Sequence, residues 1–95
     1  MSTSKYILFT DHLASATTLD RYIKINAKTF LNAFDSATRL ITDDVYLIRI
    51  YERMPNTRGK KYLHIANLRW NGTLDRITGD TPTDIDEMGV MLYED

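Results

Sequence analysis

The dipeptide Asn71-Gly72 stands between two runs of strand-forming residues, and it constrains the fold more than any other feature of the chain. Both residues tolerate the positive φ that a two-residue type I′ turn requires, so the pair is a strong signal for a β-hairpin. We therefore expect residues 73–78 to run back alongside the preceding strand, residues 60–70, with residue 70 facing residue 73. A five-residue loop separates that strand from another strand-like run, residues 45–54, which extends the hairpin to a three-stranded antiparallel meander.

The N-terminal half of the chain predicts a second hairpin and one helix. Residues 5–13 and 19–25 are rich in aromatic and β-branched residues and flank a short polar loop, which is typical of an antiparallel strand pair. Apolar residues then recur with helical spacing, which predicts an amphipathic helix over about 27–41 with Asn26 as its N-cap. The apolar stripe of this helix consists of Phe30, Leu31, Phe34, Ala37 and Ile41.

The C-terminal residues carry two competing patterns. Thr81-Pro82, with Asp84 two residues later, is typical of a helix start, because Pro fits the first helical position and negative charge is favoured in the first turn. Gly89 opposes a long helix, and a short helix followed by a closing strand over 90–94 is the alternative. We expect one α+β domain over residues 1–95, in which an antiparallel sheet of about five strands packs on one helix, with a short C-terminal helix or strand.

Composition excludes several classes of protein. The chain has 95 residues and 43% apolar content, enough for one small core. There is no cysteine, so disulfides, thiolate zinc sites and a cysteine nucleophile are excluded. No stretch approaches the roughly 18 apolar residues that span a bilayer, and the N-terminus lacks the apolar region of a signal peptide. We expect a soluble, cytoplasmic protein, in its own cell or in a host cell, with no membrane partner.

Patterns that would carry catalysis or metal binding are weak. His64 alternates with residues expected in the core, and the side chains of His12 and Asp11 point to opposite faces of a strand, so neither histidine is expected to act as a general base. The segment 84–95 matches part of a calcium loop, but Met88 occupies a position that requires an oxygen ligand. We expect a non-enzymatic protein without a metal or a cofactor.

The net charge of -1 hides a basic middle segment, because residues 45–69 carry six cations against Glu52 alone. If residue 54 faces residue 60 across the loop, side-chain alternation places the strand cations on one face of the meander. The opposite face is then the core wall: Tyr46, Ile48, Ile50, Tyr62, Ala66, Leu68, Trp70 and Ile77. The predicted binding surface, including two loop cations, is Arg49, Tyr51, Arg53, Arg58, Lys60, Lys61, Arg69 and Arg76.

The C-terminal quarter is acidic and offers a competing surface. Carboxylates in a row imitate the phosphates of a nucleic acid and fit a basic groove on another protein, although helix starts and solvated surfaces also collect them. The residues of this surface are Asp84, Asp86, Glu87, Glu94 and Asp95.

Two functions fit these features. Arginine and tyrosine mixed with aliphatic residues are typical of protein interfaces, which favours a small protein-binding module. The hypothesis is an inhibitor or regulator of the kind that phages and mobile elements encode, for example an anti-defence protein that blocks a host nuclease complex. A second copy of the chain, forming a homodimer, is another candidate partner. The alternative function is nucleic-acid binding through the same basic face, because spaced cations follow phosphates while a tyrosine ring stacks on a base.

Overall fold

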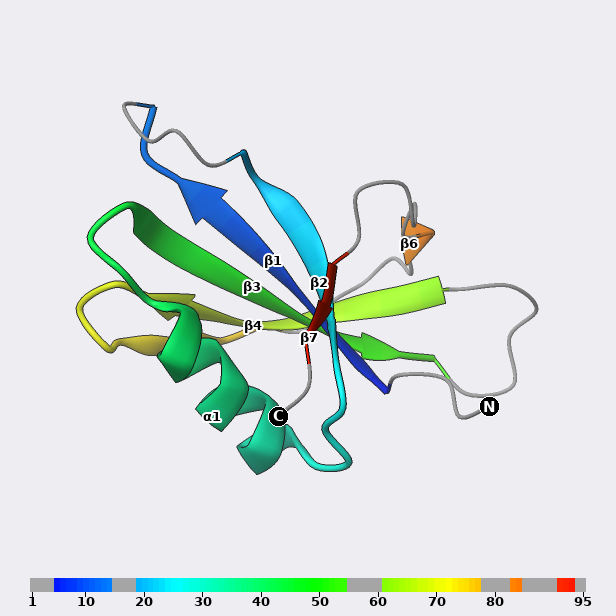
Figure 1. The fold of residues 1–95 in the computed structure, drawn as a ribbon. Coiled ribbons are helices and arrows are strands. Elements are labelled where there is room, and N and C mark those ends of the chain that lie inside the picture. The colour runs from blue at the N-terminus through cyan, green and yellow to red at the C-terminus, as the bar shows by residue number, and fades with distance from the viewer. Residues whose placement is uncertain (1–4, 15–18, 55–60, 78–82, 85–90, 94–95) are drawn as a thin grey trace.

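A computed structural model describes residues 5–14, 19–54, 61–77, 83–84 and 91–93. It confirms the expected α+β class: one helix lies on one side of a sheet whose strands fan out with a marked twist (Figure 1). The elements are β1 (Tyr6–His12), β2 (Arg21–Ile25), α1 (Phe30–Leu40), β3 (Val45–Arg53), β4 (Lys61–Arg69), β5 (Leu74–Arg76), β6 (Thr83–Asp84) and β7 (Met91–Tyr93).

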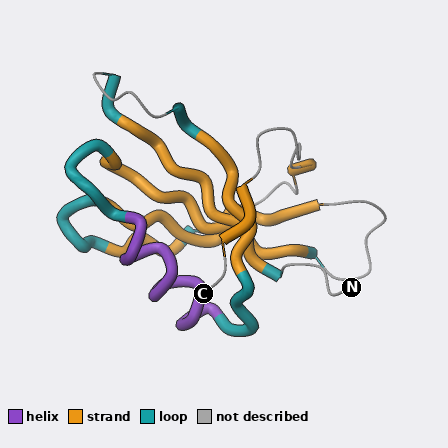
Figure 2. The backbone as a smooth tube through the Cα atoms, in the orientation of Figure 1, coloured by secondary structure: helices purple, strands orange, loops and turns teal. Residues whose placement is uncertain are grey.

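The strands follow the order β5-β4-β3-β1-β2-β7, and β6 pairs with β4. The first five of these form an antiparallel sheet, which confirms the N-terminal hairpin and the meander. Because β2 and β3 are both antiparallel to β1, which lies between them, they run in the same direction, and α1 is the crossover that joins them (Figure 2). At the C-terminal end β7 adds to β2 in parallel.

Two details of the C-terminal part bear on the predicted helix and strand there. Thr83 and Asp84, expected in the first turn of a helix, form β6 instead. Residues 91–93 form a strand, so the strand alternative holds there. Thr81, Pro82 and Gly89 lie outside the described residues.

The hairpin between β4 and β5 closes with three loop residues, not the two expected. Arg69 faces Thr73, since the backbone N–H of Arg69 donates to the carbonyl of Thr73 at 2.9 Å, and Leu68 pairs with Leu74. Gly72 has a φ of +88°, which fits the left-handed position that ends a three-residue hairpin loop. The extra loop residue is Trp70, so the predicted pairing of residue 70 with residue 73 is wrong by one position.

The helix begins later than the apolar spacing suggested. Its N-cap is Thr29, whose Oγ1 accepts a hydrogen bond from the backbone N–H of Asn32 at 3.2 Å. The expected cap, Asn26, instead lies just after β2, where the chain leaves the sheet. Leu31, predicted in the apolar stripe, is 67% exposed. The pattern could not separate the two caps, because Asn and Thr both accept from a free N–H.

The main core lies between α1 and the sheet. Small residues on the helix, Ala33 and Ala37, are fully buried and allow the helix to lie close to the strands. Ser36 is buried with them, and its hydroxyl donates to the carbonyl of Asn32 at 3.1 Å. The sheet contributes Tyr6, Leu8, Ile23, Ile25, Val45, Ile48, Ile50, Ala66 and Leu68 to this core.

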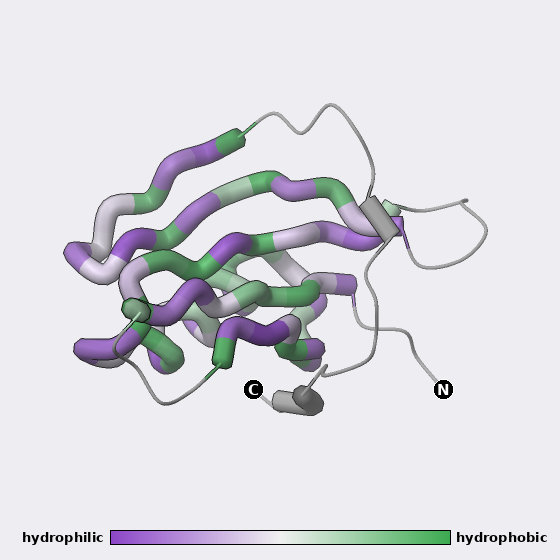
Figure 3. Tube along the Cα trace, turned by 90° about the horizontal axis from the view of Figure 1, so that it is seen from above, coloured by the Kyte–Doolittle hydropathy of each residue, from purple (hydrophilic) through white to green (hydrophobic). Residues whose placement is uncertain are grey.

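The face of the sheet opposite α1, which we call the open face, has a smaller apolar cluster of its own. Ile7, Tyr51 and Tyr62 are buried there, with Phe9 and Tyr22 packed against them. Figure 3 shows hydrophobic and hydrophilic positions alternating along the strands, as expected for a sheet with two different faces. Tyr51 is only 7% exposed, so its predicted place on an exposed binding surface is wrong.

A bulge in β4 moved several side chains from their predicted faces. Ile50 pairs with Ala66, but the next residue of β3, Tyr51, pairs with His64 and leaves Ile65 without a partner across the ladder. A bulge of this kind reverses the alternation of the strand beyond it. Tyr62 and His64, predicted on the core wall, therefore lie on the open face, and Ile65 packs against the core under α1.

The helix cap can be tested by stability. We expect Thr29→Ala to lower the free energy of unfolding by about 1 kcal/mol, because the N–H of Asn32 loses its acceptor, while Thr29→Ser restores it. Asn26→Ala, at the cap predicted from sequence, should change stability by less than about 0.5 kcal/mol. Urea unfolding followed by circular dichroism measures all three. A larger loss for Asn26→Ala than for Thr29→Ala would contradict the observed helix start.

Candidate functional site

The cations of the predicted binding surface are partly neutralised. Arg49 lies on the open face and forms a two-point ion pair with Asp11, in which Nε donates to Oδ2 at 2.9 Å and Nη2 to Oδ1 at 3.1 Å. Asp11 is buried, and desolvation raises its pKa above the ordinary value while the Arg49 guanidinium opposes that rise. Arg49 therefore holds a buried carboxylate, which ties its charge to the fold.

The arginines of β4 and β5 differ in their surroundings. Arg69 pairs with Asp75, the Nε to Oδ2 distance being 2.8 Å, and both side chains are partly exposed. Arg76 was predicted on the same face as Arg69, but it pairs with Ala66 and lies on the helix side, 4.0 Å from the centre of the Phe30 ring. The extra loop residue causes this difference, since a slip of one residue turns every side chain of a strand to the other face.

The rest of the predicted surface is dispersed. Arg53 and Lys61 are half-buried at the end of the sheet away from the β4–β5 turn. The competing acidic surface is represented among the described residues by the backbone of Asp84 in β6. The other predicted site residues lie outside the described residues: Arg58, Lys60, Asp86, Glu87, Glu94 and Asp95.

A row of rings crosses the open face, and its packing explains why residues at the centre of this face are buried. Neighbouring ring centres are 4.6 Å apart for Phe9 and Tyr22, 6.1 Å for Tyr22 and Tyr51, and 4.9 Å for Tyr51 and His64. The Nε2 atom of His64 lies 2.6 Å from the Oδ1 atom of Asn67. Contacts of this kind pack a sheet face, so these residues serve the structure of the open face.

A different surface gathers large apolar side chains in solvent. Leu13, Tyr46 and Trp70 are 44%, 43% and 66% exposed. They come from three segments, because Leu13 follows β1, Tyr46 is near the start of β3 and Trp70 follows β4. Backbone hydrogen bonds bring the three segments together, because the N–H of Leu13 donates to Asp44 at 2.8 Å and that of Trp70 to Tyr46 at 3.1 Å. Leu13, Tyr46 and Trp70 therefore lie at the same end of the sheet.

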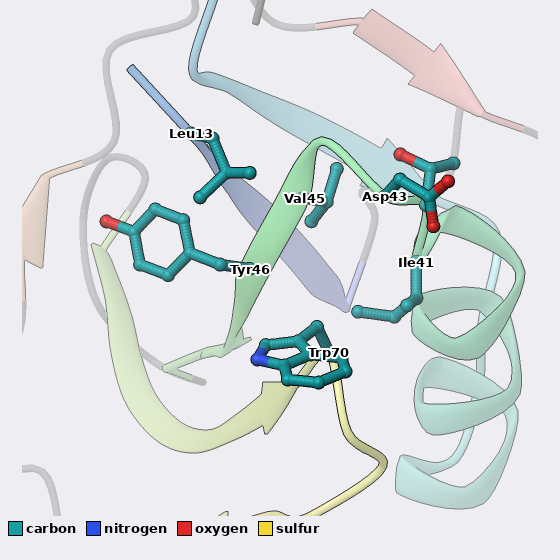
Figure 4. Close-up of a pocket in the computed structure, with 7 residues that line it drawn as sticks. Leu13, Ile41, Asp43, Val45, Tyr46 and Trp70 are labelled. Carbon is teal, nitrogen blue, oxygen red and sulfur yellow. The ribbon is translucent and has the colours of Figure 1, made fainter. Parts of the chain in front are cut away.

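These side chains surround a hollow of about 370 Å³ (Figure 4). We call it the aromatic hollow, and its lining residues are Leu13, Ile41, Thr42, Asp43, Val45, Tyr46 and Trp70. A smaller hollow of about 150 Å³ adjoins it at Ile41 and Trp70, and Arg69 contributes to its wall. Ligand and partner sites are commonly concave and mostly apolar with a few polar groups at the margin, which this hollow matches.

Sequence reasoning assigned Tyr46 and Trp70 to the core wall, and both assignments are wrong. In β3, Leu47 pairs with Asp11 and Val45 with His12, so Tyr46 is the extra residue of a second bulge and Val45 takes its place in the core. Trp70 is the extra residue of the hairpin loop. The position of Trp70 next to Asn71-Gly72 was a usable signal, because a residue beside a turn lies at the rim of the sheet.

Features of other functional classes are limited in the described part of the chain. No group of three or more histidine, aspartate or glutamate side chains there is arranged to hold a metal ion. No helix there has the length and apolar character needed to cross a membrane. Comparison of the chain with protein-family models, curated proteins and solved structures finds no match.

The Asp11 carboxyl offers a direct test of the open-face electrostatics. We expect its pKa, measured by carboxyl carbon NMR, to lie above the ordinary 3.8, because desolvation outweighs the attraction of Arg49. An acid whose pKa is raised by folding adds stability below its unfolded pKa and loses it as pH rises through the folded pKa. The free energy of unfolding of the wild-type protein should therefore fall as pH rises from the unfolded to the folded pKa of Asp11. Asp11→Asn should remove that fall. A measured pKa below 3.8 would show that Arg49 dominates instead.

Proposed function

We propose that this protein is a non-enzymatic protein-binding module and that the aromatic hollow is its contact surface. The observation that carries the proposal is the convergence of exposed Trp70, Tyr46 and Leu13 around one hollow. Tryptophan and tyrosine are enriched among the residues that dominate binding energy at protein interfaces. Exposed apolar groups gathered in one place, with a polar margin, are typical of interaction sites.

The energetics favour a partner that inserts an apolar side chain. Burying one side chain of the size of leucine or phenylalanine is worth roughly 1.5–3 kcal/mol, and aromatic contacts with Trp70 and Tyr46 add to this. The backbone ladder between β1, β3 and the β4–β5 loop holds these anchors in place before binding. A preformed site loses less conformational entropy on association.

Arg69 links this surface to the basic face expected from sequence. It lines the smaller hollow beside Trp70, and its ion pair with Asp75 is partly exposed. Arginine at the margin of an apolar contact contributes both its charge and its stem. Under this proposal the protein acts by occupying a surface of its partner, as an inhibitor or regulator of phage or mobile-element type does.

The contact surface can be tested by affinity capture followed by measurement with the purified partner. We expect Trp70→Ala and Tyr46→Ala to weaken binding at least about tenfold, because both remove an aromatic anchor. The matched control is Leu31→Ala, which removes a 67% exposed apolar side chain from α1, outside the lining of the hollow. Equal affinities of all three variants for the partner, by calorimetry, would contradict the proposed surface.

Nucleic-acid binding is the weaker candidate, because Arg49 and Arg69 already pair with carboxylates. The observation that favours this candidate is that Arg53 and Lys61 lie at the same end of the sheet. We expect labelled DNA and RNA to show no binding at physiological salt in fluorescence anisotropy. Tight binding that falls steeply with salt and is lost in Arg53→Gln and Lys61→Gln would promote this function over protein binding.

A further inference from the structure

A second hollow, of about 240 Å³, lies beside the aromatic hollow and shares Thr42 and Val45 with it. It opens between the C-terminal end of α1 and the adjoining ends of β1, β2 and β3. Among the described residues that line it, two are arginines and none is an aspartate or a glutamate. We call it the cationic pocket, and its lining residues are Thr10, His12, Arg21, Ile23, Arg39, Leu40, Thr42 and Val45.

Arg21 is the central feature of this pocket. It pairs with Thr10 across the β1–β2 ladder, and Thr10 pairs with Ile48 of the main core, so the Arg21 side chain lies on the helix side of the sheet. Its Nε–H is buried and meets no acceptor among the described residues. A buried donor without an acceptor costs roughly 1–3 kcal/mol. A ligand that supplies an acceptor to this donor removes that penalty when it binds.

The charges around the pocket favour an anion. Asp20, the nearest described acidic neighbour in sequence, is engaged by His12: its Oδ1 accepts the backbone N–H at 2.6 Å and lies 3.3 Å from the ring Nδ1. The C-terminal end of α1 contributes a partial negative charge of about one half. Arg21 carries a full positive charge, which outweighs that partial charge, and guanidinium groups bind oxyanions with directed N–H donors.

The neighbouring carboxylates select the kind of anion. Asp43 lines the aromatic hollow, and Asp44 is exposed beside it. A phosphate backbone that passed from one hollow to the other would bring repeated negative charges against these aspartates. A single carboxylate on a protein segment brings one charge, which Arg21 receives, while an apolar side chain of the same segment enters the aromatic hollow.

We propose that the cationic pocket binds an aspartate or glutamate carboxylate of the partner segment whose apolar side chain fills the aromatic hollow. The inference rests on the proposed function and adds the chemistry of the partner: an apolar anchor with an acidic residue close to it in space. The shared wall of Thr42 and Val45 places the two subsites side by side. Arg21 is the residue that distinguishes an acidic partner from a neutral one.

The pocket can be probed without the partner, by titrating the protein with N-acetyl-glutamate N-methylamide and following the Nε–Hε NMR signal of Arg21. We expect a saturable shift, because the carboxylate accepts from that group. The isosteric glutamine compound should cause no such shift. Arg21→Gln should abolish the saturable shifts of the Thr42 and Val45 amides, while Lys28→Gln, at an exposed cation outside the pocket lining, should retain them.

Three results would overturn the inference. The Arg21 signal could stay unchanged throughout the titration, or the glutamine compound could shift it equally. Inorganic phosphate, used as a separate arm, could shift it at lower concentration than the glutamate compound and be displaced by an oligonucleotide, which would assign the pocket to phosphates. Because these titrations involve no partner, their failure is separate from that of the proposed function. The proposed function is tested by the affinity of the Trp70→Ala and Tyr46→Ala variants for the partner.

Discussion

The central strand β1 is buried on both of its faces, and the rest of the structure depends on this constraint. Tyr6, Ile7 and Leu8 are each at most 3% exposed although successive side chains of a strand point in opposite directions. The helix covers one face, so the other needs a cover of its own, which the rings of the open face supply. The same burial takes in Asp11, and a buried carboxylate requires a partner. Arg49 meets that need, and its charge is therefore part of folding before it is available to any ligand.

Single-residue irregularities decide which side chains face solvent. In β3 the extra residue is Tyr46, and in the β4–β5 hairpin it is Trp70, so both leave the core and meet at one end of the sheet. The bulge of β4 acts in the opposite sense and brings Tyr62 into the cluster of the open face. A strand bends and turns its side chains at a bulge, which is why bulges occur next to functional sites. The aromatic hollow thus arises from the places where the regular ladder is interrupted.

Most elements of the described fold could be predicted from sequence, whereas the faces on which side chains lie could not. Period-two runs, the helical spacing around Phe34 and the turn at Gly72 are local features, and each produced an element where it was expected. The faces depend on register, and an error of one residue at the hairpin moved Arg76 to the helix side. Nothing in the sequence around Asn71-Gly72 separates a two-residue loop from a three-residue one, since a glycine with positive φ serves both. The described cations of the predicted basic surface do not share one face in part for that reason, and ion pairs such as Arg69 with Asp75 form only after folding.

Under the proposed function, stability and binding are served by different residues, and that separation supports a contact role of the aromatic end. The rings of the open face and the ion pair of Asp11 are needed to cover β1, so substitutions there report on folding. Trp70 is 66% exposed in a loop whose geometry depends on Gly72, so the fold leaves most of its surface in solvent. A polar residue would satisfy that loop position at lower cost in exposed apolar surface. In the proposed function, a partner buries the indole surface that the fold leaves in solvent.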